Sequence, residues 1–176
     1  MILNERETRH TQVMTAVNQM MTAARTAPKG KGIDIIEIIA VEGKDIETLS
    51  AKTKELGEKN GKPFFLRDAE NILSAEAVVL IGTRQAVQNL NCAYCGFPAC
   101  AEKPKAVPCA INAVDVGIAI GSACATAADF RLDTRVMFSV GYSAQTLNLP
   151  EGCETVFAIP VSASTKNPFF DRLPKH

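Results

Sequence analysis

Residues 91–109, NCAYCGFPACAEKPKAVPC, hold four of the six cysteines of this chain, at Cys92, Cys95, Cys100 and Cys109. Their spacing is C-x2-C-x4-C-x8-C, and two thiolates separated by two residues can reach one metal ion or two corners of one cluster. Gly96 follows the second cysteine and permits a tight turn with positive φ. Such turns point backbone N–H groups inward, toward sulfur. The segment is therefore predicted to hold a metal centre.

Three interpretations of the four cysteines stay open. Structural zinc with four cysteines usually shows two separated Cys-x2-Cys pairs. Here one pair is followed by two single cysteines, and that one-sided arrangement favours an iron–sulfur cubane, in which each iron takes one thiolate. Disulfides or incidental buried thiols are the third interpretation. We predict a [4Fe–4S] cluster, with zinc as its alternative.

The composition is that of an ordinary globular protein. The chain has 176 residues, 47% hydrophobic and 22% charged, which suits one domain over residues 1–176 with residues 91–109 as a cysteine-rich insertion. Lys plus Arg and Asp plus Glu number 19 each. This balance gives no long-range attraction to nucleic acid or to an anionic membrane.

The distribution of apolar residues indicates a cytoplasmic protein. The opening MILNERETRHTQ is polar, so we expect no secretory signal. The longest apolar run, residues 113–128, is interrupted by Asp115 and is rich in Gly and Ala. We expect it to be too short and too weakly hydrophobic to span a bilayer. In the cytoplasm, reduced thiols favour ligation over disulfides.

Hydrophobic periodicity predicts an α+β protein, a layered mixed sheet covered by helices. β-branched apolar runs predict strands over residues 33–41, 77–82 and 154–161. Helices are predicted over the following ranges: 5–27, 44–60, 68–73, 110–130 and 132–147. The helix over 110–130 carries very small side chains, which suit close packing against another helix or a partner subunit.

Three further features bear on function. Residues 27–32, APKGKG, form a cationic loop that could cradle a phosphate or could be a solvated turn. Phe169 and Phe170 in the tail are costly to leave in water, so the tail should dock on its own core or on a second subunit. Histidines occur only at His10 and His176, and no Ser-His-Asp or Cys-His pair can be argued. If the protein is an enzyme, its chemistry belongs to a cofactor.

The chain resembles uncharacterised prokaryotic ferredoxin-domain proteins, which have a nitroreductase-like core and a cysteine-rich insertion. The resemblance covers nearly the whole chain. The matching segments are TAARTAPKGKGID, NCAYCGFPAC, AVDVGIAIGSACATAA, DTRVMFSVGYSA and IPVSASTKNPFFDR. The Cys-x2-Cys-Gly-x3-Cys core is also similar to four-iron four-sulfur domains of corrinoid and electron-transport proteins. The resemblance implies a nitroreductase-like fold and a homodimer.

The chain is also similar, residue by residue, to flavin-dependent nitroreductases. That similarity implies FMN binding by Arg9 in the early arginine-containing segment and by Pro28, Lys29 and Gly30 in the loop after the first helix, with Arg135 facing the phosphate. In this sequence Lys29 stands where those enzymes have serine, and their asparagine has no clear counterpart.

Two functions of different classes follow. The first is a cytoplasmic redox protein that holds an iron–sulfur cluster and transfers electrons, coupled to a flavin and acting as a flavin- or iron–sulfur-dependent oxidoreductase, with a partner that the sequence does not name. The second is a non-catalytic protein in which the four cysteines hold structural zinc. We further expect the four cysteines to converge and Cys124 and Cys153 to lie outside the site. The tail is expected to reach across a two-fold dimer.

Overall fold

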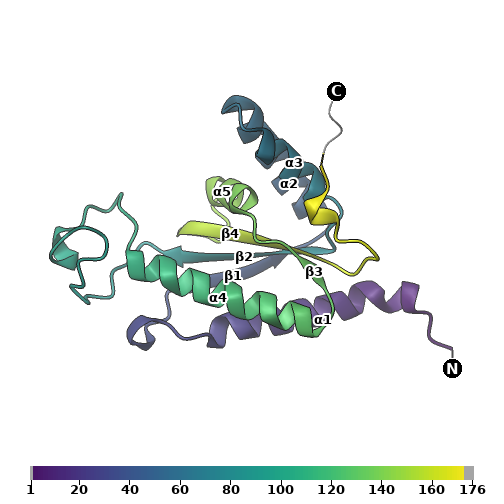
Figure 1. Cartoon of the computed structure of the whole chain (residues 1–176), viewed down its shortest axis with the longest axis horizontal. Coiled ribbons are helices and arrows are strands. Elements are labelled where there is room, and N and C mark those ends of the chain that lie inside the picture. Colours follow the sequence, from purple (N-terminus) through teal and green to yellow (C-terminus); the bar gives the residue numbers. More distant parts are fainter. Residues whose placement is uncertain (1, 173–176) are drawn as a thin grey trace.

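An antiparallel sheet lies at the centre of the computed structural model, which describes residues 2–172 (Figure 1). Its strands, in spatial order, are β1 (Ile36–Val41), β2 (Ala77–Arg84), β4 (Cys153–Ser162) and β3 (Asp133–Thr134). The three strands predicted from apolar runs are confirmed, and they share this sheet. The layered α+β fold is confirmed as well.

The predicted mixed sheet is wrong in one respect, because every pairing among the described strands is antiparallel. β1 and β2 are connected by α2 (Lys44–Lys59) and α3 (Pro63–Ile72). These two helices form a hairpin that returns the chain to the end of the sheet it left, where Val41 lies opposite Val78. A connection that returns to the same end makes neighbouring strands antiparallel.

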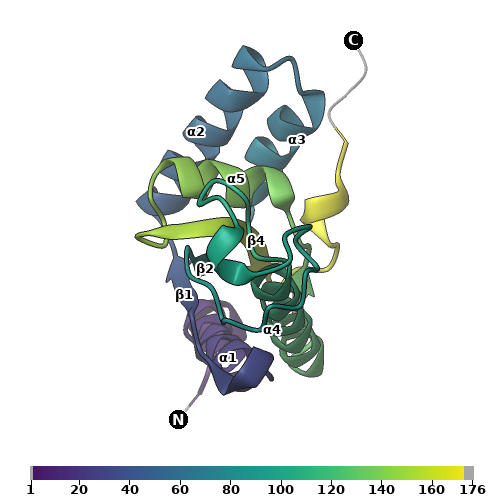
Figure 2. The same cartoon turned by 90° about the vertical axis from the view of Figure 1, so that its left-hand side faces the viewer.

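The helices form a layer on each face of the sheet. α1 (Glu5–Thr26) and α4 (Ala110–Asp129) cover one face and pack against each other. α2, α3 and α5 (Phe138–Thr146) cover the other face (Figure 2). Helix α3 begins earlier than predicted, at Pro63, because proline suits the first helical position, where no N–H is needed.

Helix α5 begins six residues later than the predicted start at residue 132. The periodicity of residues 132–137 is helical, yet the short strand β3 occupies part of this stretch. Met137 then donates its N–H to the Ala158 carbonyl at 2.8 Å and accepts the Ala158 N–H at 3.1 Å. Because sheet hydrogen bonds engage this backbone, the helix begins only after Met137.

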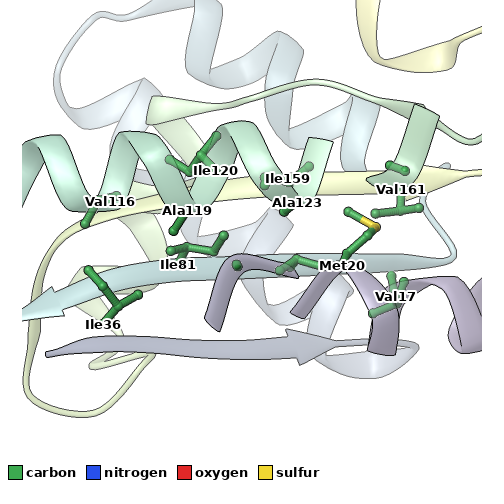
Figure 3. Close-up of a cluster of buried hydrophobic side chains, with 14 of the residues drawn as sticks. Val17, Met20, Ile36, Ile81, Val116, Ala119, Ile120, Ala123, Ile159 and Val161 are labelled. Atoms are coloured by element: carbon green, nitrogen blue, oxygen red, sulfur yellow. The ribbon is translucent and has the colours of Figure 1, made fainter. Parts of the chain in front are cut away.

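Two apolar cores lie on opposite faces of the sheet. The first fills the space between the sheet and the α1–α4 pair, and its side chains come from both layers (Figure 3). Its labelled members are Val17, Met20, Ile36, Ile81, Val116, Ala119, Ile120, Ala123, Ile159 and Val161. The second core lies under α2 and α5 and includes Leu49, Val140 and Phe169. Burying each large apolar side chain contributes about 1.5–3 kcal/mol.

The tail docks on its own subunit, so the expectation that it reaches across a dimer is wrong for Phe169. This ring is 0% exposed in the second core. The Phe169 carbonyl accepts hydrogen bonds from Asn71 Nδ2 at 2.9 Å and from Arg135 Nη1 at 2.7 Å. Phe170 remains 54% exposed. Burial of the ring and these two hydrogen bonds together hold the tail against its own chain.

Helix α4 is long and apolar enough, by length and composition, to cross a membrane, with a mean hydropathy of 1.4. The sequence-based expectation that this run falls short is therefore wrong on those two measures. The buried face of α4 packs against α1 and the sheet, which accounts for the apolar composition. The buried charge of Asp115 lies on the same face.

Candidate metal centre

The cysteine segment connects a buried strand to a buried helix. It leaves the sheet after β2 ends at Arg84 and returns at Cys109, the N-cap residue of α4. Between these points the chain forms loops and one short 3₁₀ helix, Cys100–Glu102. The segment projects beyond one end of the sheet (Figures 1 and 2). Its two ends are thus fixed by the core, while the middle is shaped locally.

The four clustered cysteines line one cavity in this segment. Cys109 is buried, and Cys92, Cys95 and Cys100 are half-buried. The rest of the lining is mostly apolar, with contributions from Val87, Leu90, Ala93, Phe97, Ala110 and Ile111, and its two polar members are Gln88 and Lys103. An arrangement in which four thiols of one segment line one largely apolar cavity suits a sulfur-ligated metal centre whose electronic properties depend on exclusion of water.

The turns that place these cysteines have left-handed backbone conformations. Gly96 has φ +89° and donates its N–H to the Ala93 carbonyl at 2.9 Å, so the predicted turn is confirmed. Ala93 and Asn91 also have positive φ, at 60° and 48°. The Asn91 N–H donates to Cys100 Sγ at 3.4 Å. A backbone N–H directed at a cysteine sulfur stabilises negative charge on that sulfur.

The side chains do not form a mononuclear site as they stand. Within residues 2–172, no group of three or more His, Cys, Asp or Glu side chains is arranged to hold a metal ion. Four sulfurs bound to one zinc, each at about 2.3 Å, must lie within about 4.6 Å of one another. A cubane distributes its four thiolates over four irons and therefore spaces them further apart.

The two other cysteines do not line this cavity. Cys124 lies on α4 and Cys153 begins β4. Burial raises the pKa of both thiols, that of Cys153 to about 11. A thiol with a raised pKa stays protonated near neutral pH, whereas the thiolate is the form that binds metal. These two thiols are therefore inert.

A buried polar network that the sequence did not predict lies behind the cavity wall. Gln88 lines the cavity and is 2% exposed. Its Nε2 donates to Asp115 Oδ2 at 2.7 Å and to Asn112 Oδ1 at 3.2 Å. The lone charge at Asp115 inside an apolar helical run was the available signal, since such a charge needs partners when it is buried.

The residues that the nitroreductase similarity implies for FMN do not come together within the chain. Arg9 lies near the beginning of α1 and donates two hydrogen bonds of 2.6 Å to Glu5. Pro28, Lys29 and Gly30 follow the end of α1, about 25 Å further along the helix axis at 1.5 Å per residue. Arg135 lies beside α3 and the tail, where it bonds the Phe169 carbonyl and stacks over the Phe170 ring.

The loop after α1 uses its polar groups internally. Lys29 Nζ donates to the carbonyls of Ala24, Arg25 and Ala27 at 2.5–2.8 Å, which closes the end of α1. Burial lowers the pKa of this ammonium group. The Gly30 N–H donates to both carboxylate oxygens of Asp115. Because these polar groups bond within the chain, the loop caps the C-terminal end of α1.

An aromatic cleft of about 320 Å³ lies beside the cysteine segment. Ala106 and Pro108 of that segment form one wall. Phe138 and Tyr142 of α5, with ring centroids 5.9 Å apart, line it together with Phe157 and Glu154 of β4. Burial raises the pKa of the Glu154 carboxyl, against the opposing effect of the charge of Lys103.

Comparison with known proteins gives the family. Residues 105–172 match the model for uncharacterised proteins containing a ferredoxin domain (DUF2148). The chain is also 40% identical over 185 residues to an uncharacterised protein of Archaeoglobus fulgidus, a match that covers 99% of this chain and 100% of the relative. The chain belongs to this ferredoxin-domain family. In this family member, the span matched by the model includes Cys109 and leaves out the three earlier clustered cysteines.

Solved structures give the fold of the ferredoxin-domain protein. It is similar to a nitroreductase with bound FMN from Desulfitobacterium hafniense, with a TM-score of 0.59 and 14% identity over 99% of this chain and 96% of that one. A nitroreductase with bound FMN from Bacteroides fragilis has a TM-score of 0.60 and 13% identity over 92% and 81% of the two chains. A BluB-like flavoprotein from Clostridium difficile has a TM-score of 0.55 and 18% identity, over 92% of this chain and 84% of that one. The nitroreductase-like fold is therefore confirmed.

Proposed function

We propose that this ferredoxin-domain protein is a cytoplasmic electron-transfer protein that holds a [4Fe–4S] cluster with Cys92, Cys95, Cys100 and Cys109. The observation that carries the proposal is the lining of one apolar cavity by all four cysteines. The family description and the redox character of the structural neighbours support it. Cytoplasmic location agrees with six cysteines that form no disulfide in the described chain.

The cluster would supply one-electron chemistry, and the surrounding residues would hold it and influence its reduction potential. The four thiolates would each hold one iron. Val87, Leu90 and Phe97 restrict water around them, which influences the reduction potential. The Asn91 N–H is directed at Cys100 Sγ and would stabilise negative charge there.

Zinc is the alternative occupant of the same cysteines. Zinc would draw the four sulfurs closer together than a cubane does. A non-catalytic zinc protein would need the segment to contract around one ion.

The test is an anaerobic absorption spectrum of the reconstituted protein and of serine variants. We expect broad absorption near 400 nm, lost on Cys→Ser substitution at each of the four clustered positions. Cys124→Ser and Cys153→Ser are the matched controls and should keep the absorption. One zinc per chain without visible absorption would establish the alternative, and full absorption in Cys109→Ser would overturn the four-cysteine assignment.

A second cofactor, FMN, is proposed for the aromatic cleft beside the cysteine segment. The cleft shares Ala106 and Pro108 with that segment, so electrons would pass between adjacent groups. Its aromatic walls suit a flat ring, and its volume lies within the usual range for ligand sites. We expect the fluorescence of FMN to be quenched when it binds to the protein. We expect Phe138→Ala to weaken this binding. Phe64→Ala, an exposed ring outside the cleft, is the control; unaltered binding in Phe138→Ala would remove the cleft as the flavin site.

A further inference from the structure

Gln88 forms part of the wall of the cysteine cavity, and its side-chain oxygen lies on the side of Gly30. The side chain is 2% exposed, and its Oε1 is buried without a hydrogen-bond partner. Its amide nitrogen is engaged by Asp115 and Asn112 on the other side. Asn112 Nδ2 in turn donates to the Ala86 carbonyl at 2.7 Å. These bonds fix the orientation of the Gln88 amide, with its carbonyl oxygen left over.

Asp115 places a negative charge directly behind that amide. The carboxylate is 2% exposed, and it accepts the Gly30 N–H at 3.0 and 3.1 Å as well as the Gln88 amide. No ion pair among residues 2–172 includes Asp115. The nearby Lys29 ammonium is directed at the carbonyls that end α1. The charge is solvated by N–H dipoles without a paired cation.

Gly30 makes this close arrangement sterically feasible. A Cβ at this position would lie 2.3 Å from Gln88 Oε1 and 2.8 Å from Ile111 Cγ2. The loop after α1, the loop between β2 and the first cysteine, and the helix that follows the last cysteine thus meet at Gln88 and Asp115. Gln88 joins this network to the wall of the cysteine cavity.

Resting on the proposed cluster, we infer that Asp115, directly behind Gln88 in the cavity wall, lowers the reduction potential of this cluster. Reduction adds one negative charge to the cavity. The Asp115 carboxylate opposes that added charge, and no ion-pair partner among residues 2–172 neutralises it. Lys103, which also lines the cavity, acts in the opposite direction. Because charge around a cluster sets its potential, the Asp115 carboxylate stabilises the oxidised cluster relative to the reduced one.

The physical size of the effect is measurable. A unit charge about 10 Å from a cluster, at an effective dielectric constant near 20, shifts the equilibrium between the oxidised and the reduced cluster by more than tenfold. A tenfold change in the ratio of reduced to oxidised cluster is 59 mV for one electron.

The decisive variant is Asp115→Asn. It removes the charge, and the asparagine Oδ1 can still accept the Gln88 amide and the Gly30 N–H, which both reach one oxygen of Asp115. Loss of the charge favours the reduced cluster, so we expect its ratio to the oxidised form to rise at least tenfold at fixed potential. Asp129→Asn, an exposed aspartate at the end of the same helix about 21 Å away at 1.5 Å per residue, is the control and should change nothing.

A second variant, Gln88→Met, alters the cavity wall and keeps the Asp115 charge. We expect a change well below that of Asp115→Asn. Potentials are measured by anaerobic redox titration of the cluster absorption, with circular dichroism to verify folding. If the unaltered protein takes up no cluster, the proposed function fails. If the cluster forms and Asp115→Asn titrates like the unaltered protein, or if Gln88→Met shifts the ratio as much as Asp115→Asn does, the inference is overturned while the function stands. A folded Asp115→Asn variant that loses the cluster overturns it as well, because the carboxylate would then serve assembly.

Discussion

Asn91 and Cys100 exchange two hydrogen bonds across the cysteine segment. The Asn91 N–H donates to Cys100 Sγ at 3.4 Å, and the Cys100 N–H donates to Asn91 Oδ1 at 2.9 Å. Asn91 has φ +48°, a conformation that asparagine adopts more readily than most residues. This reciprocal pair closes the loop that contains Cys92 and Cys95. The closed loop includes three of the four cysteines, with Cys100 at its end.

We expect Asn91→Ala to accelerate cluster loss in air about fivefold. The substitution removes one hydrogen bond, a loss of about 1 kcal/mol. It also places alanine at positive φ, and Asn89→Ala controls for that second cost because Asn89 has φ +53°. The measurement is the decay of absorption near 400 nm after exposure to air. Equal decay rates in the two variants would show that the pair does not protect the site.

The buried tail predicts a large stability difference between neighbouring phenylalanines. Phe169→Ala empties a fully buried site and should cost about 3–5 kcal/mol. Phe170→Ala removes a half-exposed ring and its contact with Arg135, and should cost no more than about 1 kcal/mol. The midpoints of urea unfolding, compared at unchanged slope, provide the measurement. Similar midpoints for the two variants would contradict the docking of Phe169 in its own core.

Local patterns predicted the strands because three of them are buried apolar runs. β2 is buried from Ala77 to Thr83, and its first six residues, AVVLIG, include no polar side chain. The late beginning of α5 could not be predicted in this way. It depends on the bridge between Met137 and Ala158, a contact with a strand that follows later in the chain, and local periodicity carries no information about it.

The candidate site likewise has one part that local sequence predicts and another part that depends on contacts between distant residues. The cysteine spacing is local and was sufficient to predict which thiols share a cavity-forming segment. The contacts behind the cavity are not local, since Asp115 binds an amide 85 residues earlier, at Gly30, and a side chain 27 residues earlier, at Gln88. Their residue types are ordinary, and only the fold brings them together.

Cys153 should react slowly with alkylating agents. Burial, followed by the charge of Glu37, raises the pKa of this thiol from 9.0 to about 11. At pH 8 the thiolate fraction is then about a hundredfold smaller than for an unperturbed thiol. The rate of iodoacetamide labelling, followed by mass spectrometry at this position, should rise with pH up to about 11, whereas the urea-unfolded chain should level off near 9. A plateau near 9 in the folded protein would contradict the burial argument.

The outer face of α4 carries an uncharged apolar stripe. Val114 and Ile118 are 54% and 41% exposed, and Gly117, Gly121 and Ala125 lie exposed along the same side. These positions recur at helical spacing, and the small residues let another backbone approach closely. An exposed stripe of this kind is typical of an interface.

We propose that this stripe packs against its copy in a two-fold homodimer, without the tail crossing between subunits. Light scattering at micromolar concentration should give a dimer mass for the intact chain and a monomer mass for Ile118→Lys, because two lysines would face each other across the symmetric interface. Leu73→Lys, at an apolar residue 49% exposed beyond α3, is the matched control and should remain dimeric. A monomer mass for the intact chain would refute the dimer. A dimer that persists in Ile118→Lys would locate the interface away from α4.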